Sequence, residues 1–582
     1  MNRAEALKQG LSLFLPQPKK PTGHGFPAIP HQDVIVPQAA LDPYLGWTED
    51  DVIHLLKRAM FGAKKADVAW FLANFTNVSD AVDSLLTIPA TATPLPLKFS
   101  ATNNSALVAT HPYVTTAVGA TWTTGYSSDS GTELYVSLMA WMMERMIFQD
   151  RTVVEKMVMF LHNLLPTSWN TYSNGYLSYR YTALLRQYAL GNYKNLIADM
   201  TKDGVMMEYL NNNVNTKTAP NENYARELQE LFTIGLTADA PGSYTNLNDV
   251  KGAAKVLTGH SYNVGTGNYV YYQSNHDTTS KVFSAFYNGN TIVGGQNSTT
   301  GPAELGNLLT MIFNKDETAH HIVEKLYRFF VYYKIDATVD ANVITPLATA
   351  LKQNGYNLGP ILGTLLKSQH FYDVASRGCF IKTPLDLYIG GIREYGLQFP
   401  DPNTNLKDYY DALYRVANDL CGPAGQQPLF PPDVAGWKAY YQSPSFHELW
   451  INTSTVQSRD KYLAKFIDGI SMSDPISPYA ALTGSPFKVD VIAYASTMPN
   501  PSDPDALVSD FIKYLFRNPV DPAIQASLKT ANLLGGQVSN YYWTNAWNAY
   551  IAAPTTANVN IVRPRLQTLL KQLMKMAEYH LA

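Results

Sequence analysis

The sequence predicts a mainly α fold: a large multi-helix body with long Asn/Thr/Gly-rich loops and a small β-hairpin. Apolar residues recur with a period of 3.6 over most of the 582 residues. Capping residues precede many of these stretches, and glycine or proline follows them. The absence of a fixed-period repeat argues against a solenoid. No window contains 18 consecutive apolar residues, so we expect no membrane-spanning helix.

The first helix shows how each element is justified. Thr48 can cap the N–H of Asp51, acidic residues fill the first turn, and Gly62 follows as a stop signal. One apolar face is formed by Val52, Leu55, Leu56 and Ala59. The same periodicity predicts helices at about 64–74, 79–87, 133–149, 152–165, 178–190, 193–201, 222–235, 248–258, 303–313, 317–333, 341–353, 359–369, 383–396, 407–419, 505–517, 521–533 and 560–580.

Composition divides the chain into four parts. Residues 1–45 are rich in proline and lack helical periodicity, so they are expected to form an extended N-terminal arm. Residues 46–470 form the main helical domain. The Pro/Ser/Asp-rich residues 471–505 resemble a linker-like loop, and residues 506–582 form a C-terminal helical unit.

Long polar loops separate some of the helices, at roughly 90–130, 262–300 and 470–503. Loops of this length inside a compact protein are usually functional or disordered. In the second loop, Tyr269–Gln273 and Lys281–Tyr287 alternate in polarity and are expected to pair as two short antiparallel strands.

Charge and composition exclude several classes of function. The 44 Lys and Arg residues against 47 Asp and Glu residues give a net charge of −3, and charged residues make up only 16% of the chain. Such a chain has no general basic field for nucleic acid or an anionic membrane. The 38 tyrosines, with many Asn and Thr residues, are more typical of extracellular than of cytosolic proteins.

The two cysteines and the N-terminus leave the compartment open. Cys379 and Cys421 lie in no CxxC or CxxH motif, which excludes thiolate zinc, haem c and iron–sulfur sites. They form either one disulfide or two buried thiols. The apolar run Leu11–Leu15 is shorter than the ~7–15 residues of a signal peptide. Export without a signal, a signal outside this sequence, and an intracellular protein are the three alternatives.

The segment Pro220–Gly235 carries the most informative acidic residue. Tyr224, Leu228, Leu231 and Ile234 define an apolar arc, and Glu227 is expected to project inside it. An ionised carboxylate in the core must be paired or hydrogen-bonded, or else it becomes protonated. Glu227 therefore either locks helix packing or serves as acid, base or ligand. The flanking residues Glu222, Arg226 and Glu230 follow at i,i+4 steps, which predicts a ladder bridged by Arg226.

A second candidate lies in a polar loop. Asn275, His276 and Asp277 are followed by Lys281. Histidine titrates near neutral pH and an adjacent aspartate can orient it, which suits acid–base chemistry. The alternative is a solvated turn with an Asx hydrogen bond.

Other histidines have weaker claims to a site. His162 lies near the end of its expected helix, where a cationic imidazole could cap the dipole, or it could meet a substrate. The pair His320 and Glu324, with His321 beside it, offers metal ligands, but one pair is not a site, and we expect neither metal nor cofactor. The HExxH, GxSxG and GxxxxGK motifs are absent, as is GxGxxG in a strand–helix context, which weakens hydride transfer, P-loop hydrolysis and elbow-serine hydrolysis.

The last candidate is the proline-rich segment Pro428–Trp437. It is a rigid turn that presents Asp433 and ends in glycine and Trp437. Ring and carboxylate together could stack on and hydrogen-bond a sugar or peptide. Equally, Trp437 could fill the core while Asp433 caps a helix.

Several short blocks of the sequence are spread over roughly residues 48–465. They are His54–Ala59 with Phe61-Gly62, His162-Asn163, Leu185-Arg186 with Ala189–Tyr193, Asn221–Glu227 to Gly235, Leu257–Gly259, His276-Asp277, Lys325-Leu326, Lys382–Pro384 and Pro432–Trp437. Together, and in this order, these blocks resemble the bacterial domain-of-unknown-function family 1800. Three positions depart from the family pattern: His260 replaces a tryptophan, and Leu161 and Leu164 replace an aromatic residue and a second histidine.

The resemblance implies a location rather than an activity. The family has no settled activity to carry over, but it is usually found in bacteria that secrete many proteins, often beside genes for a second uncharacterised family resembling sulfatases and phosphatases. This association implies export, a role at polymers outside the cell, and a sulfatase-like partner protein.

These observations lead to a functional hypothesis with an alternative. The chain is expected to be an exported protein that cleaves an extracellular polymer, a polysaccharide, as a glycoside hydrolase or polysaccharide lyase. The alternative is a non-catalytic surface scaffold or binding protein whose buried Glu/Arg/His network is structural. The expected catalytic residues are Glu227, Glu222, His276, Asp277 and Arg226, and the expected substrate-binding residues are Trp437, Asp433, Asn223, His162 and Lys281.

Overall fold

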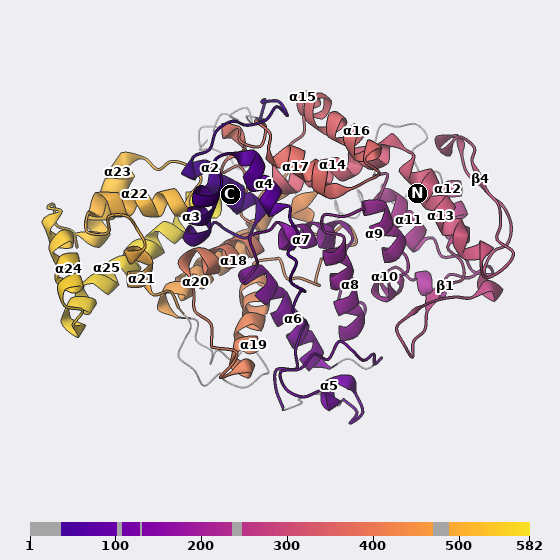
Figure 1. Ribbon diagram of the computed structural model, residues 1–582, viewed down its shortest axis with the longest axis horizontal. Coiled ribbons are helices and arrows are strands. Elements are labelled where there is room, and N and C mark those ends of the chain that lie inside the picture. The colour runs from indigo at the N-terminus through magenta and orange to yellow at the C-terminus, as the bar shows by residue number, and fades with distance from the viewer. Residues whose placement is uncertain (1–35, 102–106, 129–130, 236–246, 470–487) are drawn as a thin grey trace, which may run out of the picture. The chain divides into compact units, whose positions relative to one another are not determined.

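Helices make up most of the described chain, which confirms the mainly α prediction (Figure 1). The computed structural model describes residues 36–101, 107–128, 131–235, 247–469 and 488–582. Residues 1–35 of the expected N-terminal arm lie outside the described part of the chain. In this described part, β structure is limited to two small two-stranded antiparallel sheets.

The N-terminal half of the described chain is helical up to the first strand. Its α-helices are α2 (Glu49–Ala59), α3 (Lys65–Asn74), α4 (Val78–Leu85), α5 (Pro112–Thr115), α6 (Thr132–Ile147), α7 (Val154–Leu164), α8 (Gly175–Gln187), α9 (Tyr193–Met200), α10 (Gly204–Tyr209), α11 (Asn223–Glu230) and α12 (Leu247–Val256). The strands follow as β1 (His260–Tyr262), β2 (Tyr269–Tyr271), β3 (Lys281–Val282) and β4 (Thr291–Ile292).

Helices continue from β4 to the C-terminus. They are α13 (Thr300–Phe313), α14 (Asp316–Phe330), α15 (Ala337–Val339), the π-helix η4 (Asp340–Ile344), α16 (Thr345–Gln353), α17 (Leu358–Leu366), α18 (Pro384–Tyr395), α19 (Leu406–Arg415), the π-helix η6 (Val416–Cys421), α20 (Thr453–Asp468), α21 (Val491–Ser496), α22 (Pro504–Leu515), α23 (Pro522–Leu528), the π-helix η9 (Lys529–Leu533), α24 (Tyr541–Ala552) and α25 (Thr556–Lys575). Short 3₁₀ turns occur at Asn212–Val214, Gln273–Asn275, Ala285–Tyr287, Val374–Ser376, Lys438–Tyr440, Phe446–Trp450 and Ala577–His580.

The first helix begins as the sequence predicts. Thr48 and Asp51 form a reciprocal capping box, in which the Thr48 hydroxyl accepts the Asp51 N–H and the Asp51 carboxylate accepts the Thr48 N–H. Helix α18 begins in a related way, since Thr383 caps Asp386 and Pro384 occupies the first turn. Local sequence therefore fixes where these two helices start.

The strand pairing differs from the prediction. The expected pair of Tyr269–Gln273 with Lys281–Tyr287 is wrong, because β2 pairs with β1 and β3 pairs with β4. A tight turn explains the β1–β2 pairing: the N–H groups of Asn263 and Gly267 bond to the carbonyls of Asn268 and Asn263. Because this turn is short, β2 pairs with β1, the strand next to it in the sequence.

Helix packing builds one hydrophobic core through Val36–Ala582. Helix α6 packs against α19 and α18, α14 against α16 and α7, and α12 against α11 and α13. Helices α20, α21 and α24 all contact α25. Figure 1 shows α21–α25 in orange and yellow at one end of this unit, while α12, α13 and the strands lie at the other end.

Some helices escaped the sequence prediction. Helix α21 lies inside the expected linker-like loop, and α10, α20 and α24 were not predicted. Helix α24 is rich in aromatic residues, which have modest intrinsic helix propensity, so its packing against α25 stabilises it. None of the described helices is both long and apolar enough to span a membrane.

The cysteines are free thiols in this structure. Cys379 is half-buried and contacts the carbonyls of Val331 and Ser376, while Cys421 is buried. Burial raises the pKa of Cys379 to about 11, although the nearby Arg58 lowers it. Of the two alternatives, the structure shows the two thiols.

Candidate functional site

His162 is buried in the core and does not face a ligand. The backbone N–H of Leu429 donates to its Nε2 at 3.0 Å, so the proton of the neutral ring lies on Nδ1, which is 2.7 Å from the Tyr181 hydroxyl. That hydroxyl donates onward to the Leu165 carbonyl. Burial lowers the pKa of His162 to about 3, so the ring is a neutral packing residue and not the expected cationic cap.

The neighbouring Asn163 holds the proline-rich segment. Its side-chain oxygen accepts the Trp437 N–H at 2.9 Å. Gly436 has φ +82°, and a Cβ atom there would lie 2.3 Å from the Asn163 carbonyl oxygen, so only glycine fits. Trp437 is 2% exposed and packs edge-on against His162, which removes it as a sugar-stacking surface. The core alternative for Trp437 is the one observed.

His276 and Lys281 form a sealed cluster with Glu304. His276 Nε2 lies 2.8 Å from one Glu304 oxygen, Lys281 Nζ lies 2.7 Å from the other, and none of the three is more than 2% exposed. His276 Nδ1 lies 2.9 Å from the Thr258 carbonyl, so both ring nitrogens face acceptors within the protein. The expected roles of His276 in catalysis and of Lys281 in substrate binding are not supported, because substrate cannot reach them.

Asp277 points away from this cluster and forms an Asx turn. Its carboxylate accepts the Thr279 N–H at 2.8 Å. Burial raises the pKa of Asp277, but the hydrogen bonds from Thr279 and the charges of Lys281 and Lys255 outweigh it and lower the pKa overall. The structural alternative proposed for this loop therefore describes Asp277.

Helix α11 carries the predicted charge ladder on its surface. Arg226 lies 3.2 Å from both Glu222 and Glu230, and all three side chains retain contact with solvent. Asn223 is exposed at the first turn. Arg226 thus pairs with both glutamates at the i,i+4 spacing that stabilises a helix.

The expectation that Glu227 projects into the core is wrong. Helix α11 ends at Glu230 instead of 235, and its buried face consists of Tyr224, Ala225, Leu228 and Gln229. The core polar group is Gln229, whose amide oxygen accepts the Tyr287 hydroxyl at 2.6 Å. Glu227 is half-buried at the edge of that face. A carboxylate there keeps partial contact with water.

Glu227 and Asp433 both act electrostatically on Tyr209, a tyrosine at the end of α10. Burial, together with the charges of Asp433 and Glu227, raises the pKa of Tyr209 to about 12. Asp433 is exposed. Burial raises the pKa of Tyr441 to about 12, and the charge of Asp433 contributes to this rise. We call Tyr209, Glu227, Asp433, Tyr441 and Lys325 the Tyr209 face.

Lys325 adds a basic group to the Tyr209 face. Its Nζ lies 5.8 Å from the centre of the Tyr441 ring. Burial and the charge of Arg328 lower the pKa of Lys325 to about 8, against the opposing effect of Glu324. An amine with this pKa exchanges protons near neutral pH. Lys325 belongs to a family-like block of the sequence, whereas no sequence signal marks Tyr209.

A potential cation site lies on another side of α14. His320 Nε2 is 2.7 Å from Asp340 and its Nδ1 is 3.5 Å from Glu324. The three side chains remain partly exposed. His321 does not join them, because its Nε2 faces the Leu231 carbonyl at 3.0 Å.

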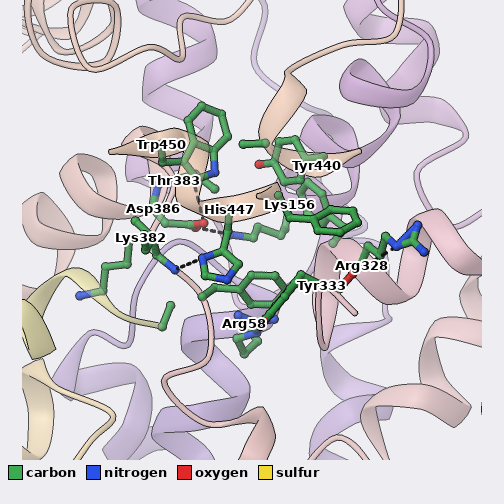
Figure 2. Close-up of a pocket in the computed structure, with 16 residues that line it drawn as sticks. Arg58, Lys156, Arg328, Tyr333, Lys382, Thr383, Asp386, Tyr440, His447 and Trp450 are labelled. Carbon is green, nitrogen blue, oxygen red and sulfur yellow. Dashed lines mark hydrogen bonds and ion pairs between the residues drawn. The ribbon is translucent and has the colours of Figure 1, made fainter. Parts of the chain in front are cut away.

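Figure 2 shows a small pocket that the sequence prediction missed. It lies between α14, the start of α18 and the 3₁₀ turn Phe446–Trp450. Its lining includes Arg58, Lys156, Lys382, Thr383, Asp386 and His447. Arg58 and Lys382-Thr383 lie in two of the family-like blocks, which was the available signal. Helix packing brings these distant blocks together.

Comparison with protein families now identifies the chain. The sequence pattern of the family described as "Protein of unknown function (DUF1800)" matches residues 54–581. This protein belongs to the DUF1800 family. Comparisons with curated proteins and with solved structures found no match.

Two glycines in the family-like blocks of this DUF1800 protein lie against other segments of the chain. Gly235 has φ +87°, and a Cβ atom there would lie 2.3 Å from His321. Gly259 has φ +83° and lies against the Tyr272 carbonyl and His276. At these two positions the family-like blocks have a structural role, because a side chain would not fit.

Proposed function

We propose that this protein cleaves an extracellular polymer, a polysaccharide, by acid–base chemistry at the Tyr209 face. The observation that carries the proposal is that the charges of two carboxylates, Glu227 and Asp433, act on the same tyrosine, Tyr209. Glycosidic bond cleavage commonly uses a pair of carboxyl groups on either side of the bond. Neither carboxylate is sealed in the core.

The titration behaviour of the face supports complementary roles. Tyr209, with a pKa of about 12, keeps its proton at neutral pH and can donate it to a leaving oxygen. Lys325, with a pKa of about 8, is partly deprotonated at pH 7–8 and can accept a proton. The half-buried rings of Tyr209 and Tyr441 can stack on a sugar, the role first expected for Trp437.

The extracellular setting of this proposal rests on two independent supports. The tyrosine-rich, weakly charged composition is typical of extracellular proteins. The bacterial context associated with the family points the same way and adds a sulfatase-like protein as a partner. Cell fractionation locates the protein, and co-purification tests the partner.

The experiment compares two conservative variants on the same helix. Glu227→Gln removes a carboxylate of the Tyr209 face, and Glu230→Gln removes one from the surface ladder. Each is incubated with a panel of neutral and acidic polysaccharides, and new chain ends and unsaturated products are measured. We expect Glu227→Gln to lower turnover by about 10²-fold or more, whereas Glu230→Gln keeps it. Equal turnover for wild type and Glu227→Gln would remove the face from the mechanism.

A second candidate is a non-catalytic extracellular scaffold or binding protein. It is favoured by the sealed cluster of His276, Lys281 and Glu304, where buried ionic groups serve packing alone. Under this alternative, the wild-type protein retains polysaccharide in a pull-down without cleaving it. Glu227→Gln then changes neither binding nor product formation.

A further inference from the structure

The pocket in Figure 2 contains a buried cation without an acidic partner of its own. Arg58 is 6% exposed, and none of the acidic groups in the described residues forms an ion pair with it. The acidic side chain whose charge acts on Arg58 is Asp386, which already pairs with Lys156. Its guanidinium also stacks on the Phe380 ring at 4.2 Å, so Arg58 is held by an aromatic face and by no carboxylate of its own in the described chain.

Part of the Arg58 guanidinium has a structural role. Its Nε donates to the Phe330 carbonyl and one terminal nitrogen donates to the Val331 carbonyl, both at 3.0 Å. These carbonyls lie at the C-terminus of α14, where a cation is favoured by the helix dipole. The second terminal nitrogen, Nη1, has no acceptor within hydrogen-bond distance among the described residues.

His447 supplies a second donor beside Arg58. The Ile381 N–H donates to its Nδ1 at 3.2 Å, so the proton of the neutral ring lies on Nε2. Burial and the charge of Arg58 lower the pKa of His447 to about 4, so the ring is neutral at pH 7. Its Nε2–H likewise finds no acceptor within the described part of the chain.

The other basic side chains of the lining do not fill the pocket. Figure 2 shows the ends of Lys382 and Arg328 directed away from its centre. Lys382 lies over the Tyr579 ring at 4.4 Å, and Arg328 lies over the Phe446 ring at 5.3 Å. Lys156, which also lines the pocket, is paired with Asp386. Among the basic side chains of the lining, Arg58 and His447 therefore have donors that no described ion pair or hydrogen bond uses.

The size of the pocket limits what it can bind. Its volume of about 30 Å³ is room for roughly two water-sized atoms. The rings of Tyr333 and Phe380 form part of its wall and pack edge-on against His447. A carboxylate has two oxygens for two donors, whereas a tetrahedral sulfate or phosphate needs more room.

We propose that this pocket binds one carboxylate group, with Arg58 Nη1 and His447 Nε2 as its donors. The carboxylate comes from a small free acid or from the acidic end of a longer ligand whose body stays outside. The proposal is independent of polymer cleavage, because it needs neither the Tyr209 face nor turnover.

Binding is tested by calorimetry and thermal unfolding with acetate, glucuronate, sulfate and phosphate at constant ionic strength. We expect saturable binding of acetate and much weaker binding of sulfate and phosphate. Glucuronate that binds as well as acetate identifies the end of a longer acid as the source, and acetate alone identifies a small free acid. No saturable binding of either carboxylate, or sulfate binding as tightly as acetate, overturns the proposal.

Two substitutions of His447 distinguish the loss of its Nε2–H donor from a general disturbance of the fold. His447→Asn keeps an acceptor near Nδ1 for the Ile381 N–H and removes the donor at Nε2, and it should weaken acetate binding about tenfold or more. His447→Gln restores a donor near Nε2 and should bind within about threefold of wild type. His320→Asn, outside the pocket, is the matched control. Acetate affinity unchanged in His447→Asn would overturn the assignment.

Discussion

The side-chain oxygen of Asn163 accepts a hydrogen bond from the backbone N–H of Trp437 at 2.9 Å. This bond joins the end of α7 to a segment more than 270 positions later in the chain. The turn that ends at Trp437 also carries Asp433, whose carbonyl accepts the Gly436 N–H at 3.0 Å. Asn163 therefore anchors the segment that contributes Asp433 to the Tyr209 face.

Replacing Gly436 with alanine should destabilise the protein and disturb this turn. The backbone at Gly436 has φ +82°, and the new Cβ would meet the Asn163 carbonyl at 2.3 Å. We expect a loss of about 1–3 kcal/mol in the free energy of unfolding, measured with urea. Gly306→Ala in α13 is the control, because no atom lies within 4 Å of its added Cβ, and it should be neutral or slightly stabilising. Equal stability of both variants would contradict the prediction.

Glu304→Gln should be strongly destabilising. It leaves the buried Lys281 and His276 without their shared carboxylate. Breaking such a buried group typically costs about 3–5 kcal/mol of unfolding free energy. Glu317→Gln, at the start of α14, removes only a loose, partly exposed pair and should cost less than about 1 kcal/mol. A small effect of Glu304→Gln on the urea midpoint would show that the cluster contributes little to the free energy of unfolding.

Stability should fall as the pH is lowered below about 6.5. Burial lowers the pKa of His162 and of His260 to about 3, against ~6.5 in the unfolded chain. Between these values the unfolded chain binds more protons, so acid favours unfolding. Each histidine should cost about 2 kcal/mol between pH 6.5 and pH 5.

Urea unfolding at several pH values measures this loss. His162→Gln should be less stable at pH 7 but should lose less stability between pH 6.5 and pH 5 than wild type. A variant with the full wild-type pH dependence would show that His162 is not held neutral.

Lys325 should react with acylating reagents at lower pH than an ordinary lysine. Its pKa of about 8 leaves a substantial fraction as free amine at neutral pH. Competitive labelling followed by peptide mass spectrometry should give a reactivity midpoint near pH 8, against ~10.4 for added Nα-acetyl-lysine. A midpoint shared with that reference would place Lys325 in water and remove it as a base.

The helical fold was predictable because helix signals are local. The capping of α2 by Thr48, the proline start of α18 and the ladder around Arg226 each depend on residues within about one turn of one another. The end of α11 was not predictable in this way. The sequence predicted it at residue 235, but the helix ends at Glu230, and Gly235 lies in a turn against His321 of α14.

The candidate site was only partly predictable. Glu227 and Asp433 could be selected as polar groups in unusual positions, but the effect of their charges on Tyr209 depends on how three distant segments pack. Conversely, the adjacent residues His276 and Asp277 diverge, one into the sealed Glu304 cluster and the other into a surface turn. Neighbours in sequence share a backbone but not a side-chain environment.

By itself, the sequence determined that this chain is mainly helical, where many helices begin, and that it belongs with the DUF1800 blocks. Only the tertiary structure decided which polar residues are sealed, which face solvent, and that Arg58 and His447 converge on one pocket. The physical reason is that helix formation depends on contacts three or four residues apart, whereas burial and electrostatic environment depend on segments hundreds of residues away.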